Sequence, residues 1–306
     1  MTPENPILNA IPPGSGLPSG SDVPRPSRLR TWLRHASLTI GGGIVLLVLV
    51  VAIAAPLIAP HDPYIQNLGR RLLPPVWDER GTWAHMLGTD QLGRDYLSRI
   101  IYGGRISLLI GLGTAAIAGT IGIGLGVLAG YFGGRVDLAI SFVITVRLAM
   151  PVVLVALAVV GLIGNSLMIV VAVLGLLLWD RFAVVTRSAV RQLRSLDYIA
   201  AAQAIGCSTT RIIWQEVLPN ALGPILVVTT VEMAHAILLE AALSFLGLGV
   251  QPPLPSWGLM ISEGRNYVFF TPWIIAIPGI ALVVLVLGIN LLGDGLRDAA
   301  SPGGRA

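Results

Sequence analysis

Hydrophobic residues in this chain are gathered into long stretches that contain no charged side chain. These stretches cover residues 36–60, 106–134, 148–178, 217–231 and 266–293. A helix needs about 20 apolar residues to cross the hydrocarbon core of a bilayer. The pattern therefore predicts membrane-spanning helices, and the polar segments between them are predicted to lie in water.

The five stretches predict six spans, because two of the stretches do not correspond to one span each. We expect the third span to start near Leu138, to include Pro151 and to end in a turn at residues 161–165. The fourth span then covers residues 166–182, and the fifth reaches about Leu248. Pro151 is expected to kink its helix, since proline removes a backbone hydrogen bond.

The composition agrees with this pattern. Hydrophobic residues make up 54% of the chain and charged residues 12%, whereas about 25% of the residues of a typical soluble domain are charged. The predicted fold class is therefore all-α, a polytopic membrane protein with six transmembrane helices. An ordinary soluble domain is excluded.

Arginine predicts the orientation, because the sequence contains no lysine and all 20 basic residues are arginine. The groups at residues 25–34 and 181–194 closely flank predicted spans, where positive charge marks the cytoplasmic side. Six spans then place both termini in the cytoplasm. The predicted organisation is a disordered cytoplasmic tail (1–35), a first span (36–60), a periplasmic loop with an interfacial helix (61–105), a five-helix core (106–298) that contains a cytoplasmic loop (183–220), and a cytoplasmic end (299–306).

One polar segment between two apolar stretches has the signals of two short helices. Asp197 is expected to cap a helix over residues 198–205, Gly206 to end it, and Ser208 to cap a second helix. Pro219 stands where that second helix would enter the membrane. A membrane protein that forms such a segment is expected to use it as a docking surface in water.

Ionisable residues inside the predicted spans are candidates for function, because each costs roughly 2.5 to 3.5 kcal/mol to insert. The four candidates for the pathway or a subunit interface are Arg147, Glu232, His235 and Glu240. Three of them, Glu232, His235 and Glu240, fall within an arc of roughly 140° on the fifth helix. The alternative is structural: Glu232 pairs with an arginine or a backbone group where two subunits meet, His235 packs between helices, and Glu240 is a structural residue.

The segment DYIAAAQAIGCSTTRIIWQEVLPNAL, residues 197–222, resembles the cytoplasmic EAA loop of ABC importer permeases. In that family this loop seats in a groove of an ATPase subunit. The residues that match the loop, and that the resemblance assigns to ATPase docking, are Asp197, Tyr198, Ala200, Ala201, Ala202, Gly206, Leu218 and Pro219. Ala200 departs from the pattern, since it replaces the glutamate of the family signature.

Three further segments resemble the dipeptide, oligopeptide and nickel branch of these importers, and within it the second, C-type permease of the pair. They are HMLGTDQLGRDYLSRIIYGGRISLLIGLG (85–113), LLEAALSFLGLGVQPPLPSWGLMI (238–261) and NLLGDGLRDAASP (290–302). The resemblance implies the type I ABC importer permease fold in a bacterial inner membrane. It also implies a homologous second permease, two cytoplasmic ATPases that hold ATP and Mg²⁺, and an extracytoplasmic binding protein. The cargo would be a di- or oligopeptide or a related small solute.

The third span departs from this branch. Its members commonly carry an arginine and an aspartate at the positions of Phe142 and Thr145, whereas this chain places Arg147 at a normally apolar position. A charge inside a span needs a partner. The identity of that partner is not evident from the sequence.

No residue pattern predicts catalysis, a cofactor or a metal site in this chain. A phosphate-binding GxxxxGK[ST] loop is absent from the sequence, which has no lysine to complete one. The arginines follow membrane edges, so a nucleic-acid partner is not expected. The alternative function is an ion-coupled secondary transporter that uses the intramembrane Glu and His side chains, but it leaves residues 197–222 without a role.

Overall fold

The structure is a computed structural model that describes residues 28–300, with side chains described for residues 36–299. The predicted disordered tail therefore lies largely outside the described residues, as does most of the predicted cytoplasmic end. Residues 28–35, which were predicted to belong to the tail, form the first turns of α1 (Arg28–Ile53).

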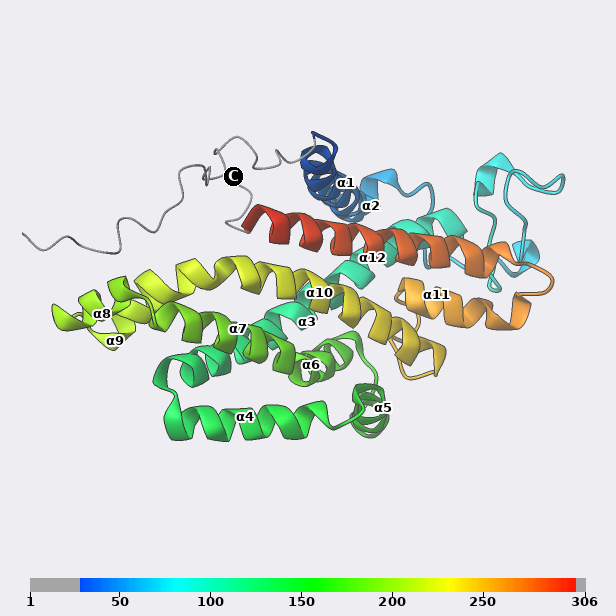
Figure 1. Cartoon of the computed structure of the whole chain (residues 1–306). Helices are drawn as coiled ribbons and strands as arrows, with labels where there is room; N and C mark the ends of the chain where they lie inside the picture. Colours follow the sequence, from blue (N-terminus) through cyan, green and yellow to red (C-terminus); the bar gives the residue numbers. More distant parts are fainter. Residues whose placement is uncertain (1–27, 301–306) are drawn as a thin grey trace, which may run out of the picture.

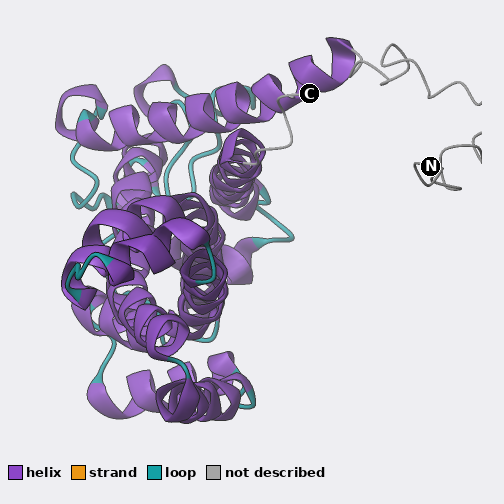
Figure 2. Ribbon diagram, turned by 60° about the vertical axis from the view of Figure 1, so that its left-hand side comes forward, coloured by secondary structure: helices purple, strands orange, loops and turns teal. Residues whose placement is uncertain are grey.

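Helices account for all the regular structure among the described residues, apart from one isolated β-bridge between Thr89 and Asp95. Figures 1 and 2 show them gathered into an elongated bundle. The longer helices after α1 are α3 (Tyr96–Phe132), α4 (Gly134–Leu148), α5 (Val152–Ile163), α6 (Leu167–Leu177), α7 (Trp179–Arg194), α10 (Leu218–Phe245) and α12 (Trp273–Ala300). The shorter ones are α2 (Ala55–Ile58), α8 (Asp197–Ala204), α9 (Thr209–Ile212) and α11 (Trp257–Gly264), with short 3₁₀ or π turns at Leu68–Arg70, Trp83–His85, Ile213–Val217 and Arg265–Tyr267.

Five helical segments of the described chain are long and apolar enough to cross a membrane. The pair α4 and α5 makes a sixth if it is counted as one span, although it bends by 82°. Pro151 stands at the bend as the N-cap of α5. Proline disfavours helical geometry at the residue before it, so the chain turns there instead of continuing. The predicted all-helical, six-span class is confirmed, and the expected kink is a sharp break.

Two helices reach beyond the predicted spans. The predicted interfacial helix is continuous with the second span, because α3 runs without interruption from Tyr96, where Asp95 caps it by accepting from the Ser98 N–H at 2.8 Å. The first part of the predicted 183–220 loop is helical, since α7 continues to Arg194. Helices therefore extend beyond the apolar stretches that predicted them.

Glycines on α3 bring this helix close to α7. A Cβ atom at Gly126 would lie 2.7 Å from the Thr186 Cβ, and one at Gly130 would lie 2.7 Å from the Arg187 carbonyl oxygen. A Cβ at Gly124 would meet nothing within 4 Å. Side chains at the first two positions would force the backbones apart, so these glycines set the distance between α3 and α7.

The two ends of the bundle differ in character. Figure 1 shows α8 and α9 at one end, and the segment between α2 and α3 together with α11 at the other. We call residues 59–95 the cap segment and α8, α9 and the π turn Ile213–Val217 the docking unit. Both lie at the ends of the longer helices.

Candidate functional site

The docking unit follows α7 after a short turn and has the predicted two-helix form. Gly206 lies between α8 and α9 with φ at +84°, a conformation that glycine adopts readily and other residues rarely adopt. Ser208 caps α9, as predicted, by accepting from the Arg211 N–H at 3.4 Å. The predicted cap of α8 is wrong by one residue: Leu196 is the N-cap, and Asp197 is the first helical residue and forms no cap hydrogen bond. Its carboxylate still lies at the positive end of the helix dipole.

A small apolar core anchors the docking unit to the ends of α3 and α7. Its buried members are Val127, Tyr131, Val190, Ile199, Ile212 and Val217. Gln203 adds a hydrogen bond from Nε2 to the Tyr131 hydroxyl at 3.3 Å. Ile199 and Ile212 come from the two short helices and are each at most 1% exposed, so both helices are packed into this core.

The outer surface of the docking unit is apolar at several positions. Tyr198 is 40% exposed, Trp214 67% and Ile205 81%. Most of the predicted docking residues are also exposed, namely Asp197, Tyr198, Ala200, Ala201, Gly206 and Pro219, while Ala202 and Leu218 are half-buried. Large apolar side chains exposed together on a polar segment are typical of a protein-binding surface. Ile205 and Trp214 were missed from sequence, although bulky apolar residues in a polar segment were the available signal.

The docking unit leads directly into the fifth span. Helical structure continues from Thr209 to Phe245 without a break, and Pro219 stands directly after the π turn Ile213–Val217, as the second residue of α10. The second short helix of the unit and α10 therefore belong to one continuous helical segment.

Glu232 on α10 forms an ion pair inside this chain. It is fully buried, and its Oε1 accepts from Arg181 Nη1 of α7 at 3.1 Å. His235 Nδ1 lies 3.3 Å from Oε2 of the same carboxylate. The structural alternative placed the partner of Glu232 where two subunits meet, whereas Arg181 lies in this chain and its side chain is 52% exposed. The sequence had indicated Arg181 only as a marker of orientation.

A cavity of about 690 Å³ lies between α7 and α10 beside this ion pair. Its polar lining comes from Arg181, Glu232 and Arg297, and the remaining lining residues are mostly aliphatic: Leu148, Val184, Val185, Gly223, Pro224, Val227, Val228 and Val231. The cavity walls come mainly from α7, against which the docking unit packs, and from α10, into which it continues, with Leu148 of α4 and Arg297 of α12 completing the lining.

The other two candidates from the predicted spans, Arg147 and Glu240, lie apart from Glu232 and His235. Glu240 is buried and accepts from the Ser244 hydroxyl at 2.7 Å and the Ser256 hydroxyl at 2.9 Å, so it ties α10 to the start of α11. Arg147 donates from Nη2 to the Leu177 carbonyl, while its Nε has no hydrogen-bond partner among the described residues. The structure thus brings Glu232 and His235 together and leaves Arg147 and Glu240 in separate places.

Comparison with known proteins agrees with this architecture. Residues 122–305 match the family described as binding-protein-dependent transport system inner membrane component, and residues 28–75 match the N-terminal TM domain of oligopeptide transport permease C. The di/tripeptide transport system permease protein DppC of Pseudomonas aeruginosa is 43% identical over 85% of this chain and 87% of that relative. The dipeptide transport system permease protein DppC of Escherichia coli is 40% identical over 88% of this chain and 90% of that relative.

A solved structure of the inward-facing MetNI methionine ABC transporter shares the fold. It aligns with a TM-score of 0.55 and 18% identity, over 67% of this chain and 97% of that chain. At this identity the likeness concerns the fold alone. The matched family covers more than half of this chain, and the chain therefore belongs to the binding-protein-dependent transport system inner membrane components, the permease subunits of ABC importers.

Proposed function

We propose that this permease imports di- or oligopeptides together with a second permease, two ATPases that bind ATP and Mg²⁺, and an extracytoplasmic binding protein. The relatives named as dipeptide permeases support the class of cargo. The docking unit supports the ATPase partner, because it is exposed and apolar outside yet anchored to α3 and α7 inside. This chain supplies the pathway walls and the mechanical connection.

The proposed mechanism moves the cavity walls through the docking unit. When the ATPases close on ATP, they draw the docking units of the two permeases together. Because the unit is packed against α7 and continuous with α10, both helices move with it and change the cavity that they line. The pathway then passes from inward-opening to outward-opening. In this mechanism the energy comes from the partner, and no proton transfer by Glu232 is needed.

Exposed apolar side chains on both helices of the broken span support contact with a second permease or with lipid. Phe142 on α4 is 69% exposed, and Leu154 and Leu162 on α5 are 64% and 88% exposed. Such side chains gain by leaving water. The same holds for Leu46 and Leu47 on α1, which are 60% and 63% exposed.

Transport is expected to require the complete importer. The purified chain in liposomes should neither hydrolyse ATP nor accumulate a dipeptide in response to a proton or sodium gradient. Uptake should appear once the second permease, the ATPases, the binding protein and ATP are supplied. Gradient-driven accumulation by the chain alone, lost in Glu232→Gln, would instead support an ion-coupled carrier.

In the complete importer, Glu232→Gln is expected to reduce uptake only partly. The amide keeps a hydrogen bond to Arg181 but removes the negative charge that balances the guanidinium group, which lies 3.1 Å away. Uptake rate and recovery of the assembled complex should be measured side by side, with Asp78→Asn in the cap segment as a control at a partly exposed carboxylate. Complete loss of uptake from a fully assembled complex would show that Glu232 takes part in transport itself.

Cys207 tests the proposed orientation, in which both termini and the docking unit are cytoplasmic. It is the only cysteine in the chain and is half-buried between α8 and α9. In intact cells it should resist a membrane-impermeant maleimide, and it should react once the membrane is opened and the ATPases are removed. Labelling from outside intact cells would show that the orientation is the opposite one. The Cys207→Ser variant provides the background signal.

A further inference from the structure

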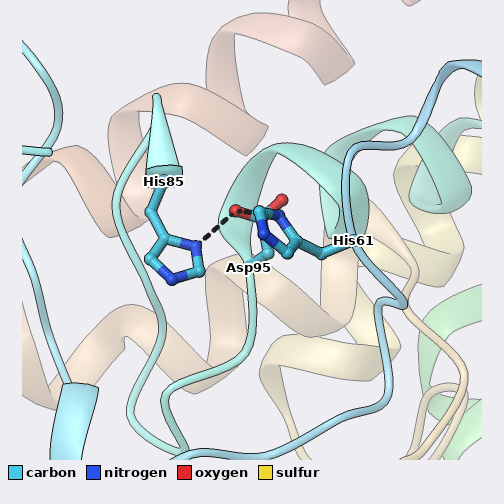
Figure 3. A group of neighbouring side chains, drawn as sticks. All are labelled: His61, His85 and Asp95. Carbon is cyan, nitrogen blue, oxygen red and sulfur yellow. Dashed lines mark hydrogen bonds and ion pairs between the residues drawn. The ribbon is translucent and has the colours of Figure 1, made fainter. Parts of the chain in front are cut away.

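Three metal-ligating side chains meet at the cap segment, far from the docking unit and the cavity. His61 follows α2, His85 lies in the Trp83–His85 turn, and Asp95 caps α3 (Figure 3). His85 and Asp95 are ten positions apart in the 85–113 segment, and His61 comes from an earlier part of the chain. The sequence analysis did not predict that the three would meet. The ligand atoms available to a metal, one from each residue, all lie within 4.8 Å of one another.

The geometry converges on one carboxylate oxygen. His85 Nδ1 lies 2.9 Å from Asp95 Oδ1, and His61 Nδ1 lies 3.6 Å from the same oxygen. The two imidazole rings are 4.9 Å apart between centroids and tilted by 35°. Ligands about 2.1 Å from a zinc ion can be at most about 4.2 Å from one another. A small movement of the His61 side chain, which is 44% exposed, brings all three within that limit.

The second oxygen of Asp95 is held in place by the start of α3. Oδ2 accepts from the Ser98 N–H at 2.8 Å and from the Ser98 hydroxyl at 2.7 Å. The same hydroxyl accepts from the His61 backbone N–H at 3.1 Å. Ser98 therefore fixes both the carboxylate and the backbone of His61, as groups behind metal ligands commonly do.

The charge balance favours a cation here. Asp95 is 3% exposed, and a buried carboxylate needs a positive partner. Its partners at ion-pair distance among the described residues are the two histidines. The neighbouring Arg94 and Arg99 are directed to Asp90 and Glu263 instead. The exposed side of His61 leaves a path for an ion and for a water ligand.

We propose that His61, His85 and Asp95 bind one divalent transition-metal ion, with Zn²⁺ as the expected species and water completing its coordination. Two imidazoles and one carboxylate are ligands that suit zinc. The ion would join the chain after α2, the cap segment and the start of α3, and so hold the cap segment on the bundle. This replaces the expectation from sequence that the chain has no metal site.

Direct metal binding by the full chain tests this proposal. The chain should carry an affinity tag without histidine and Cys207→Ser, so that the tag and the only thiol contribute nothing. After treatment with a chelator, titration with Zn²⁺ should give one equivalent per chain in calorimetry. Titration with Co²⁺ should give a visible absorption band that Zn²⁺ removes. Zn²⁺ should also raise the Tm of the chain.

Two ligand variants and one matched control decide the outcome. His61→Gln and His85→Gln should each weaken binding at least about 100-fold, beyond the 10- to 100-fold typical for residues that only orient a ligand, and should abolish the Tm increase. His235→Gln, at a histidine remote from the cluster, should leave metal binding unchanged. His85 is buried, and if His85→Gln fails to fold, the comparison of His61→Gln with the parent chain decides the outcome. Absence of saturable Zn²⁺ binding, or equal binding by His61→Gln and the parent chain, overturns the proposal.

Discussion

Gly206→Pro is expected to abolish peptide uptake while the chain still inserts into the membrane. Proline fixes φ near −65°, whereas Gly206 has φ at +84°. The substitution also removes the hydrogen bond from the Gly206 N–H to the Gln203 carbonyl, which is 3.0 Å long, and it disfavours the near-helical geometry of Ile205. The turn between α8 and α9 cannot then form. Uptake by the reconstituted importer and the amount of chain in the membrane are the two measurements.

Alanine provides a matched comparison at two glycines. Gly206 and Gly247 both have φ at +84°, and a Cβ at either would meet nothing within 4 Å, so the strain should be similar, about 1–2 kcal/mol. Gly247 follows α10 at the end opposite the docking unit. Gly206→Ala should therefore reduce uptake more than Gly247→Ala. Equal effects, or wild-type uptake by Gly206→Pro, would mean that the unit does not couple the ATPases to transport.

Restoring the glutamate that the docking unit lacks tests for a gain of uptake, whereas the glycine variants test for a loss. Ala200 is exposed on α8, so Ala200→Glu adds the charge of the family signature without crowding the small core. Uptake should stay the same or increase. A strong decrease would show that the ATPase partner of this chain is adapted to alanine at that position.

Asp90→Ala is expected to unfold the cap segment. Asp90 is 1% exposed and lies between two buried arginines: Arg94 donates to it from Nε at 2.6 Å, and Arg99 donates from Nη1. Removing one member of a buried ion pair costs about 3–5 kcal/mol, because the remaining charge is left without its partner. Glu263, at 2.9 Å from Arg99, compensates only in part. A lower Tm and faster proteolysis within residues 59–95 are the expected observations.

Asp78→Asn is the control for this prediction, since Asp78 pairs with Arg80 on the surface of the same segment and should be dispensable.

The pH dependence of stability offers a second check on the role of Asp90. Burial raises the pKa of Asp90, but the charges of Arg99 and Arg94 and the hydrogen bonds from Arg94 outweigh it and hold the pKa below its usual value. The stabilisation is then fully present above about pH 3.9, the unfolded value, and is lost only as the pH falls through the lower folded value. The difference in Tm between Asp90→Ala and the parent chain should therefore persist at pH 5, and its disappearance there would contradict this assignment.

Local signals in the sequence were sufficient to predict the membrane class, the six spans and the two short helices of the docking unit. The apolar stretches, Gly206 and Ser208 determine local helix formation and helix ends, so these elements can be predicted without knowing which distant residues they contact. Helix ends were less predictable. The helix α7 continues to Arg194, beyond the predicted end of the fourth span at residue 182, because polar residues remain helical when tertiary packing covers them.

Tertiary structure alone decided which charged and polar groups meet. Glu232 pairs with Arg181, 51 positions away, and Arg99 pairs with Glu263, 164 positions away. His61 and His85 likewise share Asp95 only because the cap segment folds over the start of α3. Helical periodicity shows which face of its own helix a side chain occupies, but its partner depends on how helices pack against one another. The ion pair beside the cavity and the candidate metal site follow from that packing.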